Sequence, residues 1–150
     1  MKKPNPRLVP DFSASLPMKL LKARECVTQY FRPMLRAHDL TEQQWRVLRA
    51  LADNGSLEIS VLAERCFILM PSLSRILQKL EARGLVARAA VKSDQRRAAI
   101  MLTKDGQKLF DATVGEVEDC YREILTRFDA KHMHALDQLL DDLITATEKR

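Results

Sequence analysis

Two residues one helical turn apart, Trp45 and Arg49, have the chemistry to bind an aromatic acid. An indole can stack on an aromatic ring, and a guanidinium can hold a carboxylate through two parallel hydrogen bonds. Because positions i and i+4 share one face of a helix, both groups can reach the same ligand. A tryptophan and an arginine at this spacing also occur as a core anchor and a surface charge, so the spacing leaves both interpretations open.

A second set of residues has the chemistry to bind DNA. Small, amide and cationic side chains are interleaved with apolar ones from residue 71 onward: Pro71, Ser72, Ser74, Arg75, Gln78, Lys79 and Arg83. Arg75 can bond to guanine O6 and N7 together, and Gln78 can pair with the edge of an adenine. The two serines suit phosphate or water-mediated contacts, and we expect Lys79 and Arg83 to reach phosphate.

A helix packed on a core is needed to present these side chains. The apolar residues between them recur at helical spacing: Leu73, Ile76, Leu77 and Leu80. Pro71 suits the first turn of this helix, and Gly84 suits a left-handed cap after it. A shorter helical pattern begins at Ile59, and residues 66–70 are expected to connect the two helices.

A basic hairpin is predicted after the second helix. Two strand-like runs, residues 85–91 and 98–102, flank a polar, cationic tip. This order is typical of a winged helix-turn-helix, whose second helix enters the major groove while the hairpin reaches a neighbouring groove or backbone. We expect Asp94 to pair with an arginine, which leaves Arg96 or Arg97 free to enter a minor groove. The alternative is an ordinary surface ion pair in a turn.

The charge distribution agrees with a nucleic-acid footprint. The net charge of the chain is +5, and residues 71–104 hold 8 Lys/Arg against 2 Asp/Glu. Residues 105–150 hold 6 Lys/Arg against 11 Asp/Glu, so they should lie away from a polyanion. A solvated basic face without a partner is the alternative for the first stretch, and the winged-helix pattern disfavours it.

Capping signals delimit the other helices. Thr41 and Gln44 form a capping-box pattern that starts a helix, and Gly55 ends it. Thr103 and Asp129 can cap the last two helices of the chain.

The whole chain is predicted to be one mostly α-helical domain, residues 1–150, with a small β-hairpin wing. Residues 41–103 form the winged helix-turn-helix lobe. Residues 11–37 and 104–148 form long amphipathic helices whose apolar surface exceeds what the lobe can cover. We therefore expect them to pair with a second copy in a homodimer; a monomeric bundle is the alternative.

Several sequence segments resemble the MarR family of dimeric bacterial transcription regulators. They are LAERC (62–66), PSLSRILQKLEARGLV (71–86) and SDQRRAAIMLTKDG (93–106). The family's Asp-x-Arg wing motif falls on Asp94 and Arg96, which favours Arg96 as the DNA-contacting arginine. YFRP (30–33) and LTEQQWRVLR (40–49) resemble the branch of repressors that control homoprotocatechuate and hydroxyphenylacetate degradation.

The resemblance implies a fold, partners and a ligand pocket. It implies first and last helices interleaved across a two-fold axis, a pseudo-palindromic double-stranded operator, and a phenolic carboxylate effector bound between the dimerisation helices and the lobe. Trp45 and Arg49 match the aromatic wall and the carboxylate clamp of that pocket. The other matched positions are Glu42 near the ligand hydroxyl, Tyr121 on the fifth helix and Ser15 from the partner chain. Arg24 is a further cation expected near this pocket, and a structural pair with Glu25 or Glu42 is the alternative for it.

Other functional classes fit the sequence less well. Four glycines include no phosphate-binding loop, no nucleophile elbow is present, and His132 and His134 are two apart on a helix and face different directions. We therefore expect no enzyme, cofactor or metal site. No secretory signal or membrane span is apparent, which favours the cytoplasm.

Two alternatives concern the signal that the regulator senses. Cys26, Cys66 and Cys120 are candidates for a thiol-based oxidant sensor, although free cysteine is usually a small buried hydrophobe. An aromatic CoA thioester is the other alternative, and it would require additional cations at the mouth of the pocket. Repression, rather than activation, is what the family resemblance implies.

Overall fold

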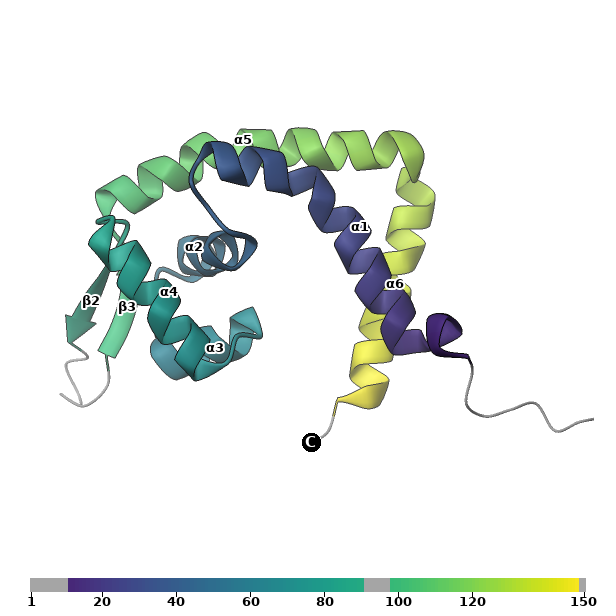
Figure 1. The fold of residues 1–150 in the computed structure, drawn as a ribbon, viewed down its shortest axis with the longest axis horizontal. Coiled ribbons are helices and arrows are strands. Elements are labelled where there is room, and N and C mark those ends of the chain that lie inside the picture. Colours follow the sequence, from purple (N-terminus) through teal and green to yellow (C-terminus); the bar gives the residue numbers. More distant parts are fainter. Residues whose placement is uncertain (1–10, 91–97, 149–150) are drawn as a thin grey trace, which may run out of the picture.

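The computed structural model describes residues 11–90 and 98–148, and it combines a small lobe with three long helices. Figure 1 shows that α5 spans the length of the molecule, from the lobe at one end to the turn into α6 at the other. The long helices are α1 (Leu16–Ala37), which follows the short 3-10 turn η1 (Phe12–Ala14), α5 (Lys104–Arg127) and α6 (Ala130–Thr147).

The lobe contains three helices and a small sheet. Its elements are α2 (Glu42–Asn54), β1 (Ser56–Glu58), α3 (Ile59–Cys66), α4 (Met70–Ala82), β2 (Val86–Ala90) and β3 (Ala98–Leu102). This confirms the helix, turn, helix and hairpin order that the sequence predicts. The predicted recognition helix, α4, starts at Met70, one residue earlier than expected. Pro71 therefore lies in its first turn, where a missing N–H is tolerated.

Side chains start the helices where the sequence predicts. The Thr41 hydroxyl accepts the Gln44 N–H at 3.1 Å, and the Gln44 side chain accepts the Thr41 N–H at 2.9 Å, which completes the capping box of α2. Thr103 accepts the Gly106 N–H at 3.0 Å at the start of α5, and Asp129 accepts the His132 N–H at 2.9 Å at the start of α6. These bonds satisfy backbone donors that a helix leaves unpaired in its first turn.

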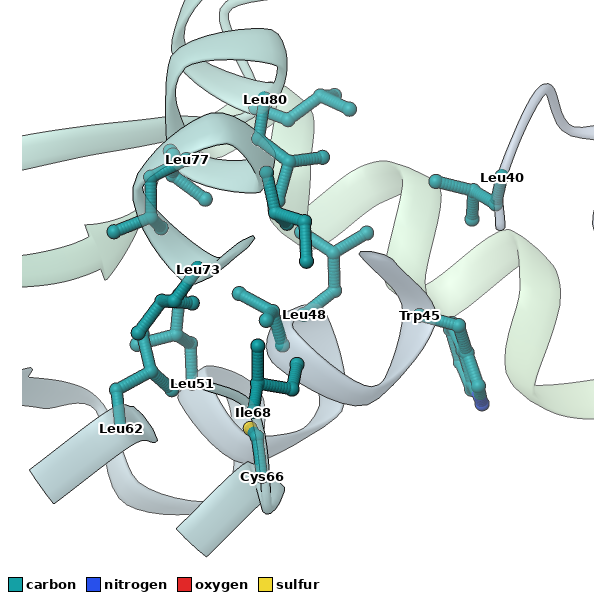
Figure 2. Packing of buried hydrophobic residues seen from close by; sticks show 14 of the residues in the cluster. Leu40, Trp45, Leu48, Leu51, Leu62, Cys66, Ile68, Leu73, Leu77 and Leu80 are labelled. Carbon is teal, nitrogen blue, oxygen red and sulfur yellow. The ribbon is translucent and has the colours of Figure 1, made fainter. Parts of the chain in front are cut away.

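The hydrophobic core lies in the lobe, where α2, α3 and α4 face one another (Figure 2). Its fully buried members include Leu48, Leu51, Leu62, Leu73, Leu77 and Leu80. Burial of each such side chain contributes about 1.5–3 kcal/mol relative to exposure. This core fixes α4 in the lobe and leaves the opposite face of α4 to solvent.

The sheet has three antiparallel strands in the order β1-β3-β2, one more than the sequence predicts. Ile100 of the central strand is fully buried, and it lies opposite Leu57 in β1 and Arg88 in β2. The additional strand was missed because three residues are too few to show a two-residue hydrophobic alternation. The tip between β2 and β3 is outside the described residues.

The helices outside the lobe carry apolar surface that one chain leaves uncovered. No residue of α6 is buried, and Leu139 is 66% exposed. Exposed apolar side chains on α1 and α6 are Leu16, Leu20, Leu21, Val27, Leu136, Leu139 and Ile144. An apolar surface of this kind is typical of an interface.

Across residues 11–90 and 98–148, no helix is both long enough and apolar enough to cross a membrane.

Gly106 allows α5 to pack closely on the lobe. A Cβ atom at this buried position would lie 2.0 Å from the Leu85 carbonyl oxygen, which also accepts the Thr103 N–H at 3.1 Å. Only a glycine permits this approach of the first turn of α5 to the segment before β2.

We expect Gly106→Ala to lower the free energy of unfolding by about 1–3 kcal/mol, because the backbone must shift to admit the methyl group. Gly115→Ala in the same helix is the control: no atom lies within 4 Å of its added Cβ, so it should raise stability by up to about 1 kcal/mol. Urea denaturation of both variants checks this, and equal effects would contradict a close approach at Gly106.

Candidate DNA-binding face and ligand pocket

The outer face of α4 is polar and exposed, as the sequence predicts. All six candidate residues on this helix are exposed, while the apolar residues between them are buried. The exposed residues are Pro71, Ser72, Ser74, Arg75, Gln78 and Lys79.

One edge of this face borders the start of α2. Ser72, Arg75 and Lys79 line a groove of about 220 Å³ together with Thr41 and residues 43–44. The N–H groups in the first turn of a helix carry a partial positive charge, so the groove combines two cationic side chains with a positive helix end. Ser74 and Gln78 do not line this groove.

Other residues expected to contact DNA are placed differently. Arg83 donates to the carbonyl oxygens of Asp39, at 2.6 Å, and His38, at 3.3 Å. Its guanidinium therefore ties the end of α4 to the loop between α1 and α2, while Arg83 stays exposed and its expected contact with phosphate stays a prediction. Asp94, Arg96 and Arg97 lie outside the described residues, and their roles remain predictions.

A cavity of about 500 Å³ lies where α1, α2 and α5 meet. Five of the six predicted ligand-binding residues line it: Arg24, Glu42, Trp45, Arg49 and Tyr121. The structure adds Thr28, Phe31, Leu35, Arg46, Phe67 and Val117. The sixth, Ser15, lies at the start of α1, donates to the Phe12 carbonyl at 2.8 Å and does not line the cavity in this chain.

Paired aromatic rings form part of the cavity wall. Trp45 stacks on Phe110 with ring centroids 5.3 Å apart and is only 8% exposed. Phe31 and Tyr121 meet edge to face at 5.2 Å, which joins α1 to α5. Trp45 is therefore a core anchor that also lines the cavity, so the two interpretations of this residue are compatible.

An ion-pair network connects α1 to the first residue of α2. The Glu42 carboxylate accepts hydrogen bonds from Arg32 Nε at 2.6 Å and from Arg24 Nη2 at 3.2 Å. Arg32 also donates to both oxygens of Glu25, at 2.5 and 2.9 Å. The hydrogen bond from Arg32 holds the pKa of Glu25 below its ordinary value, and these two carboxylates raise the pKa of Arg32.

Two further arginines of α2 face the cavity in different ways. Arg49 is exposed, and its Nε lies 4.0 Å from Asp53 Oδ2, so its guanidinium is loosely held and free to bind an anion. Arg46 donates from Nη1 to the Cys66 carbonyl at 2.7 Å and thereby ties α2 to the end of α3. Sequence reasoning missed Arg46, although it lies one helical turn from Arg49.

Two of the three thiols are in surroundings that disfavour the thiolate. Burial raises the pKa of Cys66. Burial, followed by the charges of Glu123, Asp119 and Glu116, raises the pKa of Cys120, whose thiol donates to the Tyr30 carbonyl at 3.2 Å. Cys26 is exposed on α1.

Comparisons with known proteins agree over most of the chain. Residues 38–97 match the MarR family. The chain is 44% identical to the homoprotocatechuate degradative operon repressor of Escherichia coli over 136 residues. These 136 residues cover 91% of this chain and 92% of that protein. A crystal structure of NadR in complex with 4-hydroxyphenylacetate is 39% identical, with a TM-score of 0.79 over 94% of this chain and 99% of that one. The transcriptional repressor CouR, bound to a 23-mer DNA duplex, is 29% identical, with a TM-score of 0.75 over 91% and 94% of the two chains.

We predict that Arg32→Gln lowers the thermal midpoint of unfolding at neutral pH. The folded-state pKa of Glu25 is lowered from an ordinary value of 4.5, so its pairing stabilises the fold above pH 4.5 and is lost as the pH falls through the lowered pKa. The difference between the variant and the wild type should therefore shrink below pH 4.5 in thermal melts. Arg122→Gln, which removes pairs confined to α5, is the control and should have a smaller effect. A difference that stayed constant into acid would mean that Arg32 acts through packing.

Proposed function

The chain belongs to the MarR family of transcriptional regulators, and from that premise we propose that it is a dimeric repressor of aromatic-acid catabolism genes, released from DNA by a phenolic carboxylate. The family consists of DNA-binding regulators rather than enzymes. The observation that carries the effector part of the proposal is that five predicted ligand-binding residues, from α1, α2 and α5, line one cavity. The protein acts in the cytoplasm, where its operator is accessible.

On DNA, α4 enters the major groove. Gln78 and Arg75 read base edges, while Lys79 holds a phosphate beside the positive end of α2. The wing places Arg96 or Arg97 in the adjacent minor groove, with Asp94 fixing the hairpin. The uncovered apolar faces of α1 and α6 pair with those of a second copy, so that two α4 helices read a pseudo-palindromic site with half-sites about 34–36 Å apart.

In the cavity, Arg49 binds the effector carboxylate and Trp45 flanks the ring. Both oxygens of Glu42 already accept hydrogen bonds, yet each retains a lone pair for a ligand hydroxyl. Tyr121 and Arg24 complete the polar lining, and Ser15 of the second copy closes the site. The name of the repressor relative and the ligand bound to NadR both support a phenolic acid as the effector class.

Release follows from the position of the cavity between the dimerisation helices and the lobe. A ligand that contacts α1, α2 and α5 together fixes their spacing, and that spacing sets the distance between the two α4 helices of a dimer. The ligand weakens DNA binding only to the extent that it binds the released arrangement more tightly than the DNA-bound one.

One alternative effector has support from a specific observation. A neighbouring cavity of about 380 Å³ shares Arg24 and Glu42 with the first and adds Arg32 and Arg36. These cations suit the phosphates of an aromatic CoA thioester. The raised pKa values of Cys66 and Cys120 disfavour a thiol sensor at those two positions.

We expect Arg75→Ala to weaken binding to a duplex from upstream of the protein's own gene by about 5- to 150-fold, with little effect on random DNA, because a bidentate base contact is lost. Lys79→Ala should weaken binding to both duplexes and reduce the salt slope by about 1. Fluorescence anisotropy at several fixed salt concentrations measures both effects, with Arg122→Ala on α5 as the control. If Arg75→Ala weakens binding to both duplexes equally, Arg75 contacts phosphate instead.

To test the effector, 4-hydroxyphenylacetate or 3,4-dihydroxyphenylacetate is titrated into the complex of the protein with the duplex from upstream of its own gene. Release of the duplex is followed by fluorescence anisotropy. Arg49→Ala should still bind DNA and should need at least about tenfold more acid, since it loses a charge-assisted contact. Asp53→Asn removes the partner of Arg49 but keeps its cation, so it should respond normally. Release by peroxide or by an aromatic CoA thioester, and by no free acid, would replace this effector class.

A further inference from the structure

We propose that Phe67 is a specificity-determining residue of the effector cavity, where it covers the aromatic ring of the ligand and passes the effect of binding to α4. This inference rests on the proposed effector function. Beyond that function, Phe67 would favour ligands with a planar ring over aliphatic acids, and it would connect the cavity to the DNA-binding helix.

The backbone of Phe67 adopts a conformation that usually belongs to glycine. It has φ 49° and ψ 48°, in the left-handed region, directly after α3. Its N–H donates to the Glu64 carbonyl and the N–H of Ile68 donates to the Ala63 carbonyl, both at 3.0 Å. This pair of bonds is a Schellman motif, in which the left-handed position favours glycine because a side chain is strained there.

The side chain of Phe67 is also in an unfavourable place for a structural role. It is 92% exposed, although its neighbours Cys66 and Ile68 are buried. A phenylalanine that is strained in its backbone and exposed in its side chain contributes little to the stability of this fold. A side chain at a left-handed position that favours glycine, and a large apolar ring in solvent, are both unusual. Their occurrence at one residue indicates a function.

Phe67 lines the effector cavity, and its ring is free to receive a ligand. Trp45 already stacks on Phe110, and Phe31 already meets Tyr121. In the part of the chain that the structure describes, Phe67 is the aromatic side chain of this cavity that has no ring partner. A planar ligand that stacks on Phe67 removes two apolar surfaces from water and adds a ring contact that an aliphatic acid cannot make.

The position of Phe67 along the chain connects the cavity to α4. Only Ile68 and Leu69 separate it from Met70, the first residue of α4. The carbonyl of the preceding residue, Cys66, accepts the 2.7 Å hydrogen bond from Arg46, which also lines the cavity. A ligand that contacts Phe67 and Arg46 therefore acts directly on the turn that sets the start of α4.

The test compares wild type with Phe67→Gly, a substitution that removes the ring and relieves the backbone. Thermal melts and DNA affinity are measured without ligand, and the concentration for half-release is measured with 4-hydroxyphenylacetate and with 4-hydroxycyclohexylacetate, which keeps the hydroxyl and the carboxylate but has no aromatic ring. We expect Phe67→Gly to have an equal or higher melting temperature, unchanged DNA affinity, and a half-release concentration for 4-hydroxyphenylacetate raised about tenfold. Its preference for the aromatic acid should fall by a similar factor.

Leu69→Ala is the matched control. Leu69 lies in the same turn and is 79% exposed, but it does not line the cavity, so its response to both acids should equal that of the wild type. If wild type is released by neither acid, the proposed effector class fails and the inference fails with it. If wild type is released by 4-hydroxyphenylacetate and Phe67→Gly responds identically, only the inference is overturned. A lower melting temperature or lost DNA binding in Phe67→Gly would also overturn it, because Phe67 would then serve the fold or the DNA contact.

Discussion

The carboxylate of Glu42 accepts hydrogen bonds from two arginines on different turns of α1, and this contact fastens the start of α2 to the first long helix. An acid in the first turn of a helix is also favoured by the helix dipole, so Glu42 stabilises α2 and fastens it to α1 at the same point. Both cavities at this junction include Glu42 in their lining. A change in this network would therefore alter both cavities and the junction between α1 and α2 together.

The walls of the larger cavity differ in how firmly they are held. Trp45 and Tyr121 are fixed by partner rings, whereas Arg49 has a distant carboxylate partner and Phe67 extends into solvent. The fixed side is a preformed surface, and under the proposed function it would bind a ring with a small entropy cost of ordering. The loosely held side could adjust to the proposed effector, and it is the side that leads to α4.

Local signals in the sequence were enough to predict most helices, because capping and apolar periodicity depend on residues within a few positions of each other. Thr41, Thr103 and Asp129 are examples. Contacts between distant segments were not predictable in this way. The strand β1 exists because it pairs with β3, and the guanidinium of Arg83 binds carbonyl groups more than forty residues earlier. Phe67 was missed for the same reason, since only the fold brings the end of α3 to the cavity. Arg46 lies one helical turn from Arg49, so its helical spacing could have identified it.

The last helix has a consequence for how the protein behaves at different concentrations. A helix without a buried residue gains little from folding against its own chain, so most of the stability of α6 must come from the surface that covers it. If that surface belongs to a second copy, folding and association are a single equilibrium, and the melting temperature rises with protein concentration. Occupancy of an operator would then depend on the square of the monomer concentration at low expression, which makes the response to a change in protein level steeper than a single-chain regulator allows.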